Sequence, residues 1–213
     1  MSELFTFGLL AFTSFFTLIN PLGTMPVFMT MTSELTPQQR RKTALKAVTV
    51  AFIALMIFAF SGNILFDFFG ISINSLRMVG GIIFFLMGMD MLQARLAKTK
   101  VDENSARQYV DDISVTPLGI PMICGPGSIT NAIVLMGDAP SYGHRITLIV
   151  VMALILLLTF LILWSSTKLI KILGETGNKV MLRLMGLIVM VIAVDFFFSG
   201  LKPVIIDILQ SAS

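Results

Sequence analysis

Six long runs of apolar residues follow one another along the chain, and short polar segments separate them. A bilayer core of about 30 Å needs about 20 apolar residues in a helix that crosses it. Five runs meet this length plainly, and the fourth is interrupted by glycine and proline. The pattern predicts an all-α membrane protein with six transmembrane helices, at Leu4–Met31, Ala44–Phe66, Leu76–Leu92, Ile113–Met136, Ile146–Leu163 and Leu182–Phe198.

Charge strengthens this prediction and gives it a direction. Of the 213 residues 56% are hydrophobic, 13% are charged, and the mean hydropathy is +0.92. With six spans, most of the 15 basic residues fall in the three connections on one side, and the other side keeps Arg77, Arg145 and Lys202. The positive-inside rule then predicts a bacterial-type inner (plasma) membrane protein with both termini periplasmic. These dispersed basic runs do not form a nucleic-acid-binding face.

Two halves of the chain resemble each other. Arg77–Gly80 opens the third apolar run much as Arg183–Gly186 opens the sixth, and Pro21 and Pro126 interrupt the first run of each half. Because each half has three spans, the second must enter the membrane upside down, as in many secondary transporters. The predicted organisation is a first three-helix repeat, a cytoplasmic loop, a second inverted repeat and a tail, at residues 1–93, 94–112, 113–202 and 203–213.

The interruptions are the candidate binding site. Proline opens a helix because it lacks an amide hydrogen and collides with the preceding turn, and glycine lets the backbone leave helical geometry. Opened backbone in hydrocarbon survives only where it is buried in protein or lines a polar cavity. Neighbouring helices often satisfy a single break, but two breaks at matching places favour a midplane substrate site. The predicted substrate-binding residues are Asn20, Pro21, Gly23, Thr24, Gly125, Pro126, Gly127, Ser128, Thr130 and Asn131.

The same motifs carry a family resemblance. Asn20-Pro-Leu-Gly with Pro26, and Gly125-Pro-Gly-Ser, resemble the MarC/SnatA family of integral membrane proteins over essentially the whole chain. The resemblance implies an exporter or permease of small neutral amino acids such as alanine, glycine, serine and threonine. Such a zwitterion suits the site, because half-helix amino termini bind a carboxylate and the Asn20 side chain with freed carbonyls binds an ammonium group.

We therefore predict a secondary transporter that works by alternating access with a neutral amino acid as its small-molecule partner. The alternatives are a channel, or a lipid- or metabolite-handling membrane protein that uses the same cavity. No enzyme activity and no cofactor or metal site are expected, because no HExxH, GxSxG or nucleotide-binding loop is present. Beyond membrane lipids, a homo-oligomer is left open, since Gly81 and Gly88 allow close helix approach within the chain or in a dimer.

Two carboxylates are candidates for proton coupling. Asp195 and Asp90 lie past the middle of the sixth and third runs, where burying an ionisable group costs free energy and indicates a function. Asp195 is the stronger candidate, because Asp90 lies close to Leu92 and Arg95 at the end of its run and is expected near the interface. His144 is expected in a solvated turn, and the lone cysteine, Cys124, in a buried position. The spaced methionines Met87, Met89 and Met91 do not predict a copper(I) route, because residues two apart on a helix face different directions.

Overall fold

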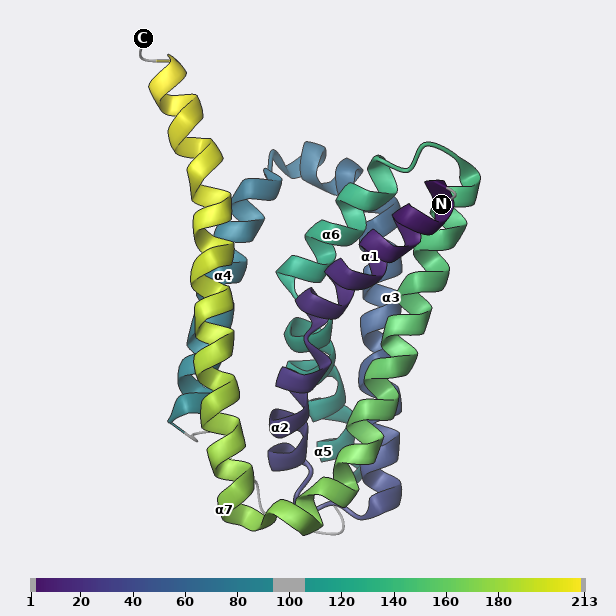
Figure 1. The fold of residues 1–213 in the computed structure, drawn as a ribbon, viewed down its shortest axis with the longest axis vertical. Coiled ribbons are helices and arrows are strands. Elements are labelled where there is room, and N and C mark those ends of the chain that lie inside the picture. Colours follow the sequence, from purple (N-terminus) through teal and green to yellow (C-terminus); the bar gives the residue numbers. More distant parts are fainter. Residues whose placement is uncertain (1–2, 94–105, 212–213) are drawn as a thin grey trace.

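The structure is a computed structural model that describes residues 3–93 and 106–211. Within those residues every regular element is a helix (Figure 1). The elements are α1 (Glu3–Ile19), α2 (Pro21–Met31), α3 (Pro37–Phe69), α4 (Ile73–Leu92), α5 (Ala106–Ile113), the interrupted helical segment η1 (Ser114–Ile123), α6 (Pro126–Gly137) and α7 (Tyr142–Ser211).

The helices run up and down between two ends of the molecule. Figure 1 shows both termini at one end, with α1 and α2 leading away from it, α3 returning and α4 leading away again. The second broken span and α7 complete the path, and α7 turns back on itself at Gly174. Five helical segments are long and apolar enough to cross a membrane, and the bent pair Gln108–Ile123 and Pro126–Gly137 makes a sixth if it is one span. This confirms the predicted all-α membrane class.

Helix ends lie beyond the apolar runs because caps, not hydrophobicity, end a helix. At the start of α3, the Gln39 amide donates to Thr36 Oγ1 at 3.4 Å, and the Thr36 amide donates to Gln39 Oε1 at 2.8 Å. This reciprocal capping box starts the helix seven residues before the apolar run predicted from Ala44. At the other end of the chain, α7 continues through Pro203 to Ser211. An apolar run therefore marks only the part of a helix that lies in lipid, and the helix extends beyond this part at its polar ends.

The two halves pass through the same series of elements. Each begins with a broken span, continues into a long helix, turns at one glycine and ends in another long helix. The turning glycines, Gly70 and Gly174, have φ of 63° and 64°, which only glycine adopts freely. In Figure 1 the first broken span leads away from the termini and the second leads toward them. These correspondences support the inverted repeat, which stays a prediction.

The end of the predicted cytoplasmic loop is helical. Residues 94–105 lie outside the described residues, but α5 begins at Ala106. Its apolar side chains Val110 and Ile113 are buried against Leu35, and the Tyr109 hydroxyl donates to the Met31 carbonyl at 3.0 Å. The sequence did not predict this helix, because it contains few apolar residues and several charged ones. Those few apolar side chains all lie on one face of the helix.

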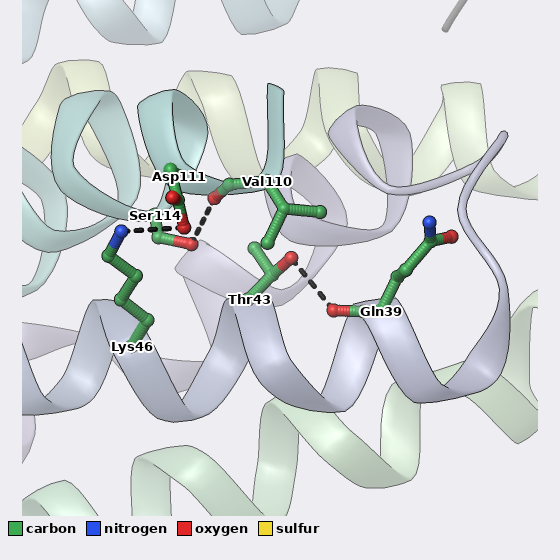
Figure 2. A network of polar contacts seen from close by, with 6 residues as sticks. All are labelled: Gln39, Thr43, Lys46, Val110, Asp111 and Ser114. Atoms are coloured by element: carbon green, nitrogen blue, oxygen red, sulfur yellow. Dashed lines mark hydrogen bonds and ion pairs between the residues drawn. The ribbon is translucent and has the colours of Figure 1, made fainter. Parts of the chain in front are cut away.

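An ion pair also fixes α5 to α3 (Figure 2). Lys46 Nζ lies 2.6 Å from Asp111 Oδ1. On one side of this pair the Ser114 hydroxyl donates to the Val110 carbonyl, and on the α3 side the Thr43 hydroxyl donates to the Gln39 carbonyl at 3.0 Å. Both charged side chains are more than a third exposed, so the pair positions α5 more than it stabilises it.

His144 does not lie in a solvated turn, which corrects the sequence expectation. It is buried in the first turn of α7, with its ring 5.1 Å from that of Phe7 in an edge-to-face arrangement. Its Nδ1 is 2.9 Å from Ser141 Oγ. The preceding turn is short, so α1 packs over the start of α7 and covers the imidazole. Cys124 is buried as expected.

Glycines allow α4 and α7 to pack backbone to backbone. A Cβ on Gly88 would lie 2.8 Å from the Gly186 carbonyl oxygen, and a Cβ on Gly186 would lie 2.8 Å from that of Gly88. A Cβ on Gly81 would lie 2.7 Å from the Ala193 carbonyl oxygen. The sequence was compatible with a role for Gly81 and Gly88 either in packing within the chain or in a dimer. In the structure both glycines pack within the chain.

Gly88→Ala tests this contact, because the new methyl group would collide with the Gly186 carbonyl oxygen. That oxygen belongs to the backbone, so it cannot move aside as a flexible side chain can. Overpacking of this kind costs about 1–3 kcal/mol. The matched control is Gly143→Ala, whose nearest neighbours lie at 3.5 Å, and a change within about 0.5 kcal/mol is expected. Unfolding in detergent is followed by alkylation of the buried Cys124 with a fluorogenic maleimide. Equal melting of the two variants would remove the proposed contact.

Candidate functional site

The first break is a single residue, Asn20, between α1 and α2. Its φ of 45° and ψ of 66° lie in the left-handed region, where asparagine is one of the few tolerated side chains. Asn20 Oδ1 accepts the Gly23 amide at 3.1 Å, and its carbonyl accepts the Thr24 amide at 3.0 Å. Pro21 then starts α2, where a missing amide hydrogen costs nothing. The motif therefore ends one helix and caps the next within one turn.

A small cavity lies directly against this break. It has about 40 Å³ of open space and draws its walls from α1, α2, α4, η1 and the second arm of α7, so both halves contribute. A cavity of this size holds a few water molecules. Its lining residues are Thr17, Leu18, Ile19, Asn20, Gly23, Thr24, Phe84, Met87, Met91, Met122, Val189 and Ile192.

The second break is capped by its own serine. Cys124 and Gly125 separate η1 from α6, and the two helical segments meet at 59°. The Gly125 amide donates to Ser128 Oγ at 3.0 Å, and that hydroxyl lies 3.1 Å from the Ile123 carbonyl oxygen and 3.0 Å from that of Gly125. The Ser128 side chain thus accepts the Gly125 amide and has one hydroxyl hydrogen to donate to the Ile123 carbonyl, while the Gly125 carbonyl also accepts the Ile129 amide at 2.9 Å.

The second interruption is longer than the motif at Gly125 and Pro126 alone predicts. Thr116 and Ile120 are extended, with φ of −132° and −133°, and each precedes a proline, Pro117 and Pro121. A residue before proline avoids helical geometry, so the signal was present in the spacing of the prolines. The irregular segment brings Met122 to the cavity at the first break.

The structure separates the predicted site residues into two groups. Asn20, Gly23 and Thr24 line the cavity, and Pro21 is buried beside it. The second motif lies behind the cavity wall. A Cβ on Gly125 would lie 2.6 Å from the Phe84 ring, and one on Gly127 would lie 3.0 Å from Leu18. Phe84 and Leu18 both line the cavity, so one layer of side chains separates it from the second break.

The remaining residues of the second motif face neighbouring helices. Pro126 packs against α4, where a Cβ on Gly80 would lie 2.4 Å from its ring. Asn131 donates to Ser14 Oγ at 3.1 Å, which joins α6 to α1. Thr130 is buried, and its hydroxyl has no hydrogen-bond partner among the described residues. The role of these residues in substrate binding stays a prediction.

The two candidate carboxylates lie in different surroundings. Asp90 is exposed and lines a second cavity, of about 180 Å³, together with residues of α2, α4 and η1. Asp195 lies on an exposed apolar groove between α4 and α7, beside Phe85, Leu187 and Val194. Only Asp90 therefore lies next to the cavity at the first break.

Methionines gather at this cavity. Met87 and Met91 are one turn apart on α4 and share a face, and Met122 of η1 joins them. Residues two apart on a helix face different directions, but Met87 and Met91 are four apart, a spacing that the sequence prediction did not include. Within residues 3–93 and 106–211, no three His, Cys, Asp or Glu side chains are grouped so that they could hold a metal ion.

Asn20 serves the break in two ways, through its left-handed backbone and through its capping oxygen. Asn20→Ala loses both, so it should destabilise the protein by about 2 kcal/mol. Asn20→Gly restores the backbone freedom and should cost less than half of that. Thermal unfolding in detergent, read by alkylation of Cys124, compares the two. If the Asn20→Ala and Asn20→Gly proteins unfolded at the same temperature, the left-handed backbone at this position would not contribute to stability.

The comparisons with known proteins agree with this architecture. The family model for the MarC family integral membrane protein matches residues 5–205. A UPF0056 membrane protein of Methanocaldococcus jannaschii is 36% identical over 91% of this chain and 95% of its own length. The relative YvbG of Bacillus subtilis, also a UPF0056 membrane protein, is 37% identical over 93% of this chain and 96% of its own. No solved structure matches. The chain thus belongs to the MarC family of integral membrane proteins.

Proposed function

We propose that this protein is a secondary transporter that exports small neutral amino acids by alternating access. The observation that carries the proposal is the cavity at the first break, which residues from both halves of the chain enclose. Broken helices that meet at the boundary between two repeats are where secondary transporters bind their substrates.

The chemistry of the cavity suits a zwitterion with a small side chain. The amino terminus of α2 offers the positive end of a helix dipole, and the Asn20 amide and Thr24 hydroxyl lie beside it. These groups suit a carboxylate. The described residues that line the cavity are all uncharged, and most are apolar. A small neutral side chain fits such a lining better than a charged one does.

The cavity volume supports a moving wall. About 40 Å³ admits a few waters but not an amino acid, which has five or more non-hydrogen atoms. Substrate therefore binds only after a wall opens, which agrees with alternating access and not with a permanently open channel. The Phe84 and Leu18 side chains are one such wall, and their displacement joins the cavity to the amino terminus of α6.

Orientation and energy source complete the proposal. The end with the basic residues of α3 faces the cytoplasm of a bacterial-type plasma membrane, which leaves both termini outside. The proton gradient drives export, with Asp90 better placed than Asp195 because it lies beside the cavity. Export by the wild-type protein should then fall when a protonophore collapses the gradient, and unaffected export would remove the coupling.

The test of the site is transport in proteoliposomes with labelled alanine, glycine, serine and threonine. Thr24→Val removes a hydroxyl from the cavity and keeps the shape of the side chain. The Thr24 hydroxyl donates to the Asn20 carbonyl at 3.2 Å, and we expect it to rotate to the carboxylate of a bound substrate. Loss of that hydrogen bond to a charged group should raise the KM about tenfold. Thr49→Val is the matched control, because Thr49 is exposed on α3 and bonds the Leu45 carbonyl at 2.8 Å.

Two outcomes would contradict the proposal in different ways. If Thr24→Val transports with the KM of the wild-type protein, the cavity at the first break is not the binding site. Flux that rises linearly with concentration, without saturation, would replace the transporter with a channel.

A further inference from the structure

A second and larger cavity adjoins the one at the first break. It has about 180 Å³ of open space and is lined by Val27 of α2, by Met87, Asp90 and Met91 of α4, and by Pro117 and Met122 of η1. This volume exceeds the 40 Å³ of the first cavity several times over, so it has room for a small amino acid. We refer to it as the lower cavity.

Both cavities share one wall. Met87, Met91 and Met122 line the cavity at the break and also the lower cavity. A methionine side chain has three rotatable bonds and a polarisable thioether, so it changes shape at little cost. A wall of three such side chains opens by rotamer changes, without movement of the helices that carry it.

The lower cavity lies on the side of the break that is away from both termini. Along α2, Val27 follows Thr24 in the direction of the carboxyl end, and along α4 Asp90 lies close to the last residue, Leu92. Figure 1 shows both helices ending toward the end of the molecule opposite the termini. In the proposed orientation this end is cytoplasmic, and cytoplasmic substrate reaches the lower cavity first.

Asp90 is the charged residue of this cavity, among methionine, valine and proline side chains. A carboxylate accepts charge-assisted hydrogen bonds from an ammonium group, and these are about twice as strong as neutral ones. The other end of the amino acid, its carboxylate, then points across the methionine wall toward the positive amino terminus of α2. The two charged ends of a zwitterion are thereby oriented along the path.

We propose that the lower cavity is the cytoplasmic vestibule of the transporter, in which Asp90 receives the substrate's ammonium group and Met87, Met91 and Met122 form the inner gate. This assignment rests on the proposed transport function. It adds the binding residue for the ammonium group, the gate and the side from which substrate arrives.

The first test measures access with cysteine probes. Cys124→Ser provides a cysteine-free background, and if that variant does not fold, the buried Cys124 is retained and its labelling subtracted. Val27→Cys then reports the lower cavity and Thr24→Cys the cavity at the break. A membrane-impermeant methanethiosulfonate should label Val27→Cys from the cytoplasmic face of inside-out vesicles and label Thr24→Cys at least tenfold more slowly.

The gate is tested by adding Met122→Ala to the Thr24→Cys protein. Shortening the side chain should speed labelling of Thr24→Cys about tenfold and leave labelling of Val27→Cys unchanged. Labelling of Val27→Cys from the periplasmic face alone, or no labelling from either face, would overturn the vestibule. An unchanged rate at Thr24→Cys would overturn the gate.

The second test concerns Asp90. Asp90→Asn should raise the KM for alanine presented on the cytoplasmic side about tenfold, and Asp90→Glu should recover most of the affinity. Asp67→Asn is the matched control, because Asp67 is exposed at the opposite end of the molecule. Wild-type kinetics in Asp90→Asn would overturn the assignment and leave transport standing. Absence of amino acid transport by the wild-type protein would instead refute the proposed function.

Discussion

The constraint on which this structure depends is that lipid offers no hydrogen-bonding partner to an opened backbone. The chain opens two helices inside the bilayer, and each opening releases amides and carbonyls that must be satisfied within the protein. Asn20 does so at the first break by accepting the Gly23 amide, and Ser128 does so at the second by bonding Gly125 and Ile123. Pro21 and Gly23 at the first break, and Pro126, Gly127 and Ser128 at the second, are buried in the protein, whereas Leu22 is exposed.

The two breaks are not equivalent, although the sequence motifs are similar. The first borders a cavity, whereas the second lies behind the side chains of Phe84 and Leu18. Ser128 is engaged by backbone groups on both sides of its break, but Asn20 keeps its amide group next to open space. The amino terminus of α2 is therefore the polar surface that this conformation offers to a solute.

One helix connects the fold to the proposed transport path. Along α4, Gly81 and Gly88 bring one face into backbone contact with α7, and Phe84, Met87 and Met91 present another face to the cavities. Because glycine packing is close and leaves little room for movement, the changeable part of the wall lies in the long side chains. In the proposed transport path, the methionines and the Phe84 ring on this helix are the gate, which does not require the core to unfold.

The sequence by itself determined the membrane class, the six apolar runs and the positions of both breaks. These follow from local physics, since apolar length, proline and glycine act where they occur. Tertiary structure alone decided that Asn20, Gly23 and Thr24 line a cavity while Gly125 and Gly127 pack behind Phe84 and Leu18. It also decided that Asp90 lines the lower cavity while Asp195 lies on the outer groove, because the side that a helical residue faces depends on which helices pack around it.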